Sequence, residues 1–318
     1  MLSSVTPSSL ETPVAMMIFN RPEVTARVFA EVRRARPRQL FIVGDGARPD
    51  RPGEEEQVAL TREAATQVDW PCDLQTLFAD QNMGCKPRVA SGLAWVFQQV
   101  EEAIILEDDC LPHPSFFGYC QELLDRYRDD QRVGAISGGN FQNGISCTPH
   151  SYYFSKYFHC WGWASWRRTW QNFDVEMKSW PQFRDREGLA TVADSATEAW
   201  YWKRLFNEQY SGLSNTSSWA YPWLYSGWTQ NALTILPDVN LISNIGFSGV
   251  GTHCTDADNR FADLPVQDVG PIDHPELVFR CVEADQYTFE RNYYRDSLSR
   301  RARRICRQLL SSSSKAAA

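Results

Sequence analysis

The feature that most restricts the fold is an apolar run at 103–106 that ends abruptly in three acids, Glu107, Asp108 and Asp109. A short continuous apolar run predicts a strand that is buried on both faces. Three adjacent carboxylates repel one another and cannot be buried with that strand unless protons or a cation compensate their charge. The chain must therefore bury the strand and leave its carboxyl end open to solvent or a ligand.

Strand-like and helix-like segments alternate through the first half of the chain. The expected strands are 13–19, 39–43, 74–78, 103–106 and 133–137, and the expected helices between them are 23–36, 54–67, 88–100 and 114–127. This alternation predicts an α/β fold with an open, mostly parallel sheet flanked by helices. In such sheets ligands bind beyond the carboxyl ends of the strands, which is where the three acids lie.

Charge and cysteine content narrow the class of protein. A net charge of −7 and a pI near 5.4 argue against a nucleic-acid-binding surface. The nine cysteines form no C-x-x-C pair, and an odd number cannot all be joined in internal disulfides, so a reducing compartment is the simpler expectation. The first residues show neither a basic region nor a long apolar stretch, so we expect a cytoplasmic protein.

The acid cluster is the strongest candidate for chemistry. Oxygen ligands of this kind suit Mn²⁺ or Mg²⁺, which keep positions open for water and for substrate phosphates. A metal ion that bridges the oxygens of a diphosphate can neutralise the charge of that leaving group. The alternative is a solvated acidic turn with no ligand.

A resemblance supports the first reading. The segments 104–112 (IILEDDCLP) and 114–119 (PSFFGY) resemble the metal-binding segment of GT-A glycosyltransferases of the N-acetylglucosaminyltransferase I type, which have a Rossmann-like sheet. The segments 161–167 (WGWASWR) and 237–247 (PDVNLISNIGF) are similar to bacterial family-2-like nucleotide-diphospho-sugar transferases. The likeness covers roughly 13–255 and implies a hexosyl- or N-acetylhexosaminyltransferase that uses a nucleotide sugar, with UDP as the expected nucleotide and inversion at the anomeric carbon.

The resemblance also implies roles for the acids. It makes Asp109 the direct metal ligand, while Glu107 and Asp108 orient the ribose and the waters of the metal. The residues alone do not rank the three.

Further residues on the nucleotide side follow from the same likeness. The segment 13–22 resembles the first strand of the family, which places Asn20 and Arg21 beside the nucleotide. Asp45, in the turn 43–46 (VGDG), corresponds to an aspartate that accepts a hydrogen bond from uracil, and Lys86, in 82–86 (NMGCK), lies in a segment that approaches the nucleotide.

The acceptor side is less well defined by sequence. Many relatives carry an acid in a Trp-Asp-Tyr-x-Trp segment, but here 219–223 is WAYPW, and the alanine at position 220 cannot accept a proton. Glu198 and Asp174 are the substitute candidates for the catalytic base, with surface salt bridging as the alternative for each. His253 is a candidate contact to the diphosphate or the metal, with a structural hydrogen-bonding role as its alternative.

Aromatic residues crowd the chain between Tyr152 and Trp228. Indoles pack well against the faces of sugar rings, so an acceptor site can be lined by tryptophans, although most are expected in the core. The candidates for acceptor binding are Trp161, Trp163, Trp219 and Trp223.

The chain is accordingly expected to have four parts. These are a flexible N-terminus at 1–12, a nucleotide-sugar-binding half at 13–150, an aromatic-rich acceptor-side half of the same GT-A domain at 151–280, and a basic amphipathic C-terminal helix and tail at 281–318. Such a helix can lie on an anionic membrane near a glycolipid acceptor, but the acidic net charge favours an ordinary surface helix. The acceptor is expected to be a glycan, a glycolipid or a protein, and peripheral contact with the inner face of the membrane is the alternative to a purely cytoplasmic location.

Three other functions compete with glycosyl transfer. A catalytically silent sugar-nucleotide-binding protein is suggested by Ala220. A sugar nucleotidyltransferase would use similar acids, but such enzymes open with a glycine-rich loop, whereas the first strand here runs into Asn20, Arg21 and Pro22. An interaction module would leave the acid cluster unexplained.

Overall fold

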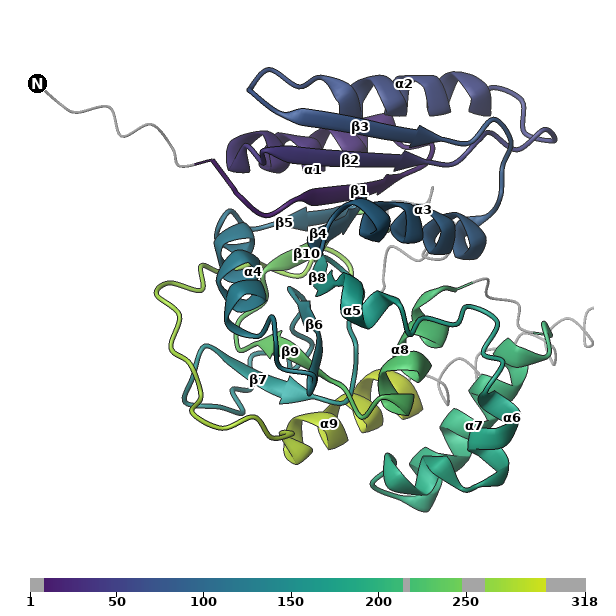
Figure 1. Cartoon of the computed structure of the whole chain (residues 1–318), viewed down its shortest axis with the longest axis vertical. Coiled ribbons are helices and arrows are strands. Elements are labelled where there is room, and N and C mark those ends of the chain that lie inside the picture. The colour runs from purple at the N-terminus through teal and green to yellow at the C-terminus, as the bar shows by residue number, and fades with distance from the viewer. Residues whose placement is uncertain (1–8, 214–217, 248–260, 296–318) are drawn as a thin grey trace, which may run out of the picture.

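The computed structural model describes residues 9–213, 218–247 and 261–295. Within them, eight strands form one twisted sheet in the order β3-β2-β1-β4-β8-β6-β9-β7. Figure 1 shows this sheet running through the molecule, with β1, β2 and β3 at one end and β7 and β9 at the other.

The first half matches the alternation expected from sequence. Its elements are β1 (Val14–Ile18), α1 (Pro22–Ala35), β2 (Gln39–Gly44), α2 (Glu54–Thr66), β3 (Asp73–Phe78), α3 (Cys85–Gln99), β4 (Glu102–Glu107), β5 (Cys110–Pro112), α4 (Ser115–Arg126) and β6 (Val133–Ser137). Strands β1 to β4 pair in parallel, which confirms the predicted α/β class. The boundaries differ from the expected ones by three residues or fewer.

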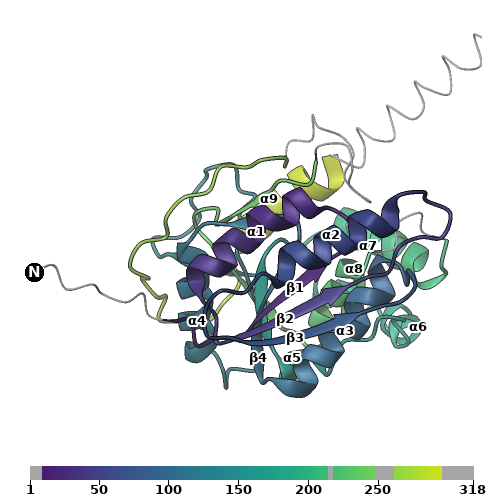
Figure 2. The same ribbon diagram turned by 90° about the horizontal axis from the view of Figure 1, so that it is seen from above.

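Strand β1 shows why these strands are continuously apolar. Val14, Met16 and Ile18 pack into the core beneath α1 and α4, while Ala15 and Met17 pack against α3 on the opposite face. All five side chains are buried. Figure 2, seen from above, shows α1 and α2 on one side of these strands and α3 on the other. A strand covered on both faces has no polar side to alternate.

The second half adds elements that the alternation does not contain. These are β7 (Tyr152–Ser155), β8 (Trp163–Trp166), α5 (Arg167–Trp170), α6 (Trp180–Asp185), η1 (Gly188–Thr191), α7 (Ala196–Tyr210), α8 (Ala220–Thr229), β9 (Leu233–Pro237), β10 (Ile242–Asn244), α9 (Val282–Thr288) and the π-helical η2 (Phe289–Tyr294). Strand β8 inserts between β4 and β6 and runs antiparallel to both. The two halves of the chain therefore share one sheet.

The expected basic C-terminal helix is only partly described. Helix α9 and η2 cover residues up to Tyr294, and the arginine-rich remainder lies outside the described residues. In the part of the chain that the structure covers, none of the helices offers an apolar stretch long enough to span a membrane.

Candidate active site

The acid cluster lies where β4 ends, near the middle of the sheet. Strand β4 is held by β1 on one side, with Glu107 opposite Met17, and by β8 on the other. The amide of Asp108 donates to the carbonyl of Met17 at 3.0 Å, so the backbone of the cluster is fixed to β1. Asp108 is buried, and Glu107 and Asp109 are partly buried. All three line one large cavity of about 1130 Å³.

Arg21 is bound to this cluster. Its guanidinium donates to Asp108 and, at 3.0 Å, to Oδ2 of Asp109. The amide of Phe19 also donates to Asp108, at 3.1 Å. Arg21 lines the cavity, and its charge is engaged by two carboxylates. The role beside the nucleotide base that the resemblance implies remains a prediction.

A second segment supports Asp109 from the other side. Strand β10 pairs with β5, and the amide of Ile245 donates to the carbonyl of Asp109 at 2.9 Å. The next residue, Gly246, packs so closely that a Cβ there would lie 2.3 Å from Oδ2 of Asp109 and 2.6 Å from Nη1 of Arg21. The buried side chain of Asn244 accepts from the amide of Gly246 at 2.9 Å.

The crowding of carboxylates changes their acidity. Burial, reinforced by the charges of Asp109 and Asp108, raises the pKa of Glu107 to about 8. Burial also raises the pKa of Asp108 to about 6, against the opposing effect of Arg21. Arg21 thus compensates Glu107 and Asp108 incompletely, and a further positive charge would favour the ionised forms of these two residues.

The acid cluster suits a metal ion only if a phosphate substrate and water complete the coordination shell. Among the described residues, no group of three or more His, Cys, Asp or Glu side chains is arranged to hold a metal. Mg²⁺ and Mn²⁺ sites that serve phosphate substrates, however, use one or two carboxylates and complete their shell with phosphate oxygens and water. Asp109 can supply such a carboxylate if its pairing with Arg21 is loosened.

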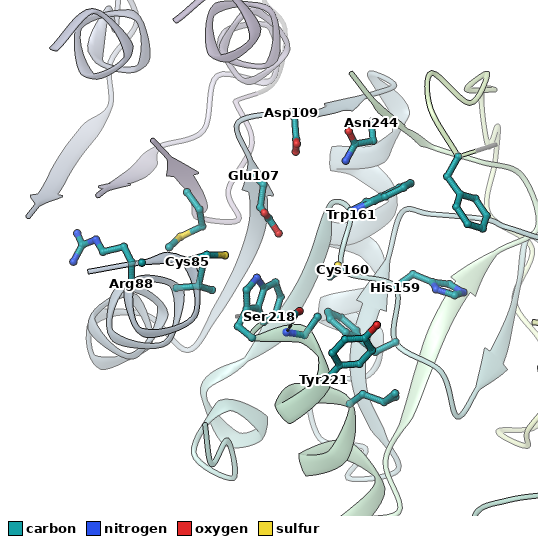
Figure 3. Close-up of a pocket in the computed structure, with 18 of the residues that line it drawn as sticks. Cys85, Arg88, Glu107, Asp109, His159, Cys160, Trp161, Ser218, Tyr221 and Asn244 are labelled. Atoms are coloured by element: carbon teal, nitrogen blue, oxygen red, sulfur yellow. Dashed lines mark hydrogen bonds between the residues drawn. The ribbon is translucent and has the colours of Figure 1, made fainter. Parts of the chain in front are cut away.

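The cavity joins the two halves of the sheet. Figure 3 shows Glu107 pointing into the space between Cys85, on α3, and Ser218 and Tyr221, which precede and begin α8. Asp109 lies beside Asn244. Pockets for single small molecules commonly measure 300–1,000 Å³. At about 1130 Å³ this cavity is larger, so it has room for a ligand made of two components.

The turn around Asp45 is organised by that residue. Its carboxylate accepts hydrogen bonds from the amides of Gly46, Met83 and Gly84 at 2.9, 2.9 and 3.0 Å, and from the amide group of Asn82 at 3.2 Å. Four donors match the acceptor capacity of a carboxylate. Asp45 lines the cavity, but it ties two loops together, and contact with a uracil ring remains a prediction.

Two other residues predicted on the nucleotide side lie away from the cavity lining. The side chain of Asn20 donates to Glu54 at 2.9 Å and so ties the end of β1 to the start of α2. Lys86 is partly buried in the first turn of α3 and does not line the cavity. Arg48 and Arg88 do line it and carry positive charge there, although the sequence analysis did not select them.

The four predicted acceptor tryptophans divide into two pairs. Trp161 and Trp219 line the cavity, and Trp219 lies near enough to Glu107 to oppose the rise in its pKa. Trp163 and Trp223 do not line it; they are buried and pack against each other with ring centroids 5.5 Å apart. For Trp163 and Trp223 the structure therefore favours a role in the core, because their rings are covered by other aromatic residues.

Neither candidate for the catalytic base reaches the cavity. Glu198 is 2% exposed, pairs with Lys156 at 2.7 Å, and accepts from the amide of Asp194 at 2.8 Å. Asp174 accepts from the amides of Glu176 and Lys178 and so closes a turn. These contacts argue against both assignments, since a base must reach the acceptor hydroxyl.

Ala220 lies in the cavity lining, at the position where the resemblance leads one to expect an acid. Among the described residues, the carboxylates that line the cavity are Asp45, Glu107, Asp108 and Asp109, and all four come from the first half of the chain. His253 lies outside the described residues. The aromatic-rich half thus contributes rings, an arginine and neutral polar groups to the described wall.

Several lining residues were not expected from sequence. Trp200 and Arg204, on α7, face the cavity, and Trp200 is 55% exposed. His159 is buried, and burial lowers its pKa to about 3, so its ring is neutral at physiological pH. Its Nε2 has no hydrogen-bond partner within the described residues. The sequence signal for Trp200 and Arg204 was their spacing of four on a helix, which places both on one face.

Comparisons with known proteins give no sequence match. No family model and no curated protein matches the chain. Among solved structures, a mannosyltransferase from Pyrobaculum calidifontis in complex with GDP-Man and Mn²⁺ is similar over 70% of this chain and 71% of its own, with 13% identity and a TM-score of 0.37. A UDP-glucose pyrophosphorylase complexed with UDP-glucose is also similar. That match covers 46% of this chain and 64% of the pyrophosphorylase chain, with 11% identity and a TM-score of 0.27. At these TM-scores the likenesses do not assign an activity to this chain.

Proposed function

We propose that this chain is a GT-A type glycosyltransferase that transfers a sugar from a nucleotide diphosphate sugar to an acceptor hydroxyl. One observation carries the proposal. Three consecutive acids end a central, doubly covered strand and open into a cavity whose other wall is rich in aromatic residues. Acids on one wall and rings on the other suit a donor diphosphate and a sugar acceptor, respectively.

The acids are proposed to hold a divalent cation together with the diphosphate of the donor. Asp109 would supply the direct ligand, and Glu107 and Asp108 would orient the ribose and the metal's waters, as the resemblance implies. Bound there, Mn²⁺ or Mg²⁺ would act as a Lewis acid that neutralises the leaving diphosphate. UDP as the nucleotide, inversion at the anomeric carbon and the hexosyl or N-acetylhexosaminyl class of donor are carried by the resemblance alone.

Arg21 has a supporting role in this proposal. Its ion pairs with Asp108 and Asp109 keep like charges together before any cation binds. With a cation held by Asp109, Arg21 would be available to bind a phosphate oxygen, which is a preferred partner for its planar donors.

A second candidate function has its own observation. Ala220 lines the cavity, and the described lining of the aromatic-rich half holds no carboxylate to accept a proton. This favours a catalytically silent sugar-nucleotide-binding protein as the competitor. A sugar nucleotidyltransferase is less well supported, because β1 runs into Asn20 and Arg21 rather than into a glycine-rich loop.

Calorimetry and thermal shift with UDP-, GDP- and dTDP-sugars, each with and without Mn²⁺, would test the proposal. A glycosyltransferase should bind one nucleotide class more tightly with the metal, and should slowly hydrolyse or transfer a labelled sugar from it. Tight binding without release of the labelled sugar over a broad acceptor panel would favour the silent protein. If no nucleotide binds with the metal present, both functions are excluded.

A further inference from the structure

Helix α7 forms a wall of the cavity that the acid cluster does not explain. Its residues Trp200, Tyr201, Arg204 and Leu205 line the cavity, and their spacing places them on one face of the helix. In Figure 1, α7 lies at the end of the molecule opposite to β1, β2 and β3. This wall therefore belongs to the side of the cavity away from the proposed donor site.

Trp200 is unusual among the tryptophans of the chain. Trp163, Trp180 and Trp202 are completely buried, whereas 55% of Trp200 is exposed. An indole left largely in water forgoes part of the hydrophobic stabilisation that burial gives, which a ligand that covers the ring could recover. A flat ring exposed on a cavity wall is well suited to the apolar face of a sugar.

Arg204 adds a positive charge beside this ring. Its guanidinium carbon lies 5.5 Å from the ring centroid of Trp200 and 5.9 Å from that of Tyr201. The carboxylate of Glu208 is 4.0 Å away, and the Arg204 and Glu208 side chains are about half exposed, at 47% and 50%. An exposed pair at this distance neutralises Arg204 only weakly.

The other arginines of the described cavity lining are more fully engaged. Arg21 is held by two carboxylates of the acid cluster, Arg48 forms several hydrogen bonds to Glu54, and Arg88 donates to a backbone carbonyl. Among the described lining residues, Arg204 is therefore the arginine best placed to accept an anion from a ligand.

We propose that the α7 wall binds a saccharide that carries an anionic group, with the sugar ring against Trp200 and the anion on Arg204. The shared chemistry is a planar or tetrahedral oxyanion on a pyranose, which a uronic acid carboxylate or a sugar phosphate supplies equally. The guanidinium can bind either group through two parallel hydrogen bonds. Taking this saccharide as the acceptor rests on the proposed function, but its binding to α7 does not require transfer.

Three matched ligands test the proposal: methyl glucuronide, methyl glucoside and a glucosyl phosphate. Saturation-transfer NMR titrations with the full chain would measure the affinity of each. At least one anionic ligand should bind about tenfold more tightly than the neutral glucoside, since one charge-assisted hydrogen bond of about 1.4 kcal/mol gives a factor of ten. The tighter of the two anionic ligands identifies the source of the oxyanion.

Three variants separate the contributions of the ring, the charge and the guanidinium geometry. Arg204→Gln should abolish the preference for the anionic ligand and leave the glucoside affinity within about twofold, because only the charged partner is lost. Trp200→Ala should weaken binding of all three ligands about tenfold, because the stacking surface is removed. Arg204→Lys keeps the charge without the two-pronged geometry and should lie between wild type and Arg204→Gln.

Matched controls lie outside the cavity. Arg33 is 41% exposed, and its guanidinium lies 5.4 Å from the ring of Phe29, so Arg33→Gln removes a similar arginine. Tyr210 is 46% exposed on the same helix as Trp200, so Tyr210→Ala removes a similar ring. Neither variant should change any of the three affinities.

The outcomes distinguish this proposal from the proposed function. Equal affinity for charged and neutral ligands, a preference that survives Arg204→Gln, or no binding of any ligand would overturn the α7 site. If Arg204→Gln does not fold, the salt dependence of the wild-type preference decides, because an arginine contact must weaken as ionic strength rises. Nucleotide binding with Mn²⁺ is measured on the same samples, so failure of the donor site appears independently of failure of the α7 site.

Discussion

Gly246 packs directly against the carboxylate of Asp109, so closely that a methyl group on its α-carbon would lie 2.3 Å from Oδ2. The same methyl group would lie 2.6 Å from Nη1 of Arg21. Gly246 is not among the residues with positive φ, so this position requires glycine for space and not for backbone conformation. The pair of Arg21 and Asp109 can keep its geometry only while position 246 has no side chain.

Gly246→Ala should therefore displace the carboxylate of Asp109. We expect metal-dependent nucleotide binding to weaken at least about tenfold and the free energy of unfolding to fall by about 1–3 kcal/mol through overpacking. Calorimetry and denaturant unfolding would measure the two effects. Gly118→Ala is the matched control, because a Cβ at Gly118 in α4 meets nothing within 4 Å. Unchanged nucleotide binding in Gly246→Ala would show that the close packing does not position Asp109.

Asp109→Ala should abolish the extra thermal stabilisation that Mn²⁺ gives in the presence of the nucleotide. The expected reason, under the proposed function, is the loss of the carboxylate that is proposed to share the cation with the diphosphate. Thermal shift with the preferred nucleotide, with and without Mn²⁺, would measure this. Asp174→Ala removes an acid outside the cavity and should leave the shift as in wild type. An undiminished shift in Asp109→Ala would remove Asp109 from the site.

Arg21→Gln should destabilise the protein by about 3–5 kcal/mol, because it leaves Asp108 and Asp109 without their compensating charge in a largely buried site. Mn²⁺ should restore part of this loss and should raise the melting temperature of the variant more than that of wild type. Arg128→Gln is the control: that arginine is 51% exposed and pairs with Glu102 at 3.1 Å, so its removal should cost less than about 1 kcal/mol. An Arg21→Gln protein as stable as wild type would contradict the ion-pair argument.

The raised pKa of Glu107 makes a prediction about stability and pH. A carboxyl whose pKa is higher in the folded state than its ordinary 4.5 stabilises the fold while it is protonated. This contribution is present in full below about 4.5 and is lost as the pH rises through about 8. The melting temperature without metal should therefore fall over this interval by more in wild type than in Glu107→Gln, whose side chain stays neutral.

Glu102→Gln, at the opposite end of β4, is the control for this pH profile. It should leave the slope of melting temperature against pH between about 5 and 8 as in wild type, because Glu102 lies outside the acid cluster. Parallel profiles for Glu107→Gln and wild type would mean that Glu107 is ionised throughout.

Glu198→Gln tests whether that residue is structural. Its carboxylate is held 2.7 Å from Lys156, and both side chains are at most 4% exposed. We expect the free energy of unfolding to fall by about 3 kcal/mol, because a buried lysine loses one of its charged partners. Below the melting temperature, sugar hydrolysis or transfer should keep its wild-type kcat. A large loss of kcat in a folded Glu198→Gln protein would restore Glu198 as the catalytic base.

Local patterns were sufficient for the first half of the chain. The strand that ends in Glu107, Asp108 and Asp109 could be recognised because both faces of β4 are covered and its apolar run is uninterrupted. The turn at Asn20 and Arg21 was visible because proline ends the strand and begins α1. These elements are predictable since each depends on residues adjacent in sequence.

In the aromatic-rich half, local patterns could not separate core residues from cavity residues. Trp163 and Trp161 are two residues apart, yet Trp163 is completely buried and Trp161 lines the cavity. Strand β8 and the loop before it decide the difference, because β8 inserts between β4 and β6. The sequence shows that both are large and apolar, but not which of them the sheet covers.

The sequence by itself determined the alternating α/β framework and the position of the acids at the end of a buried strand, because hydrophobic pattern and like-charge repulsion act between chain neighbours. Only the tertiary structure decided that Arg21 and Gly246 meet at Asp109, that Glu198 is joined to Lys156, and that Trp200 and Arg204 face the cavity. Most of these partners are far apart along the chain. Their contacts, and the orientation of α7 toward the cavity, exist only after the sheet has formed and the helices have packed on it.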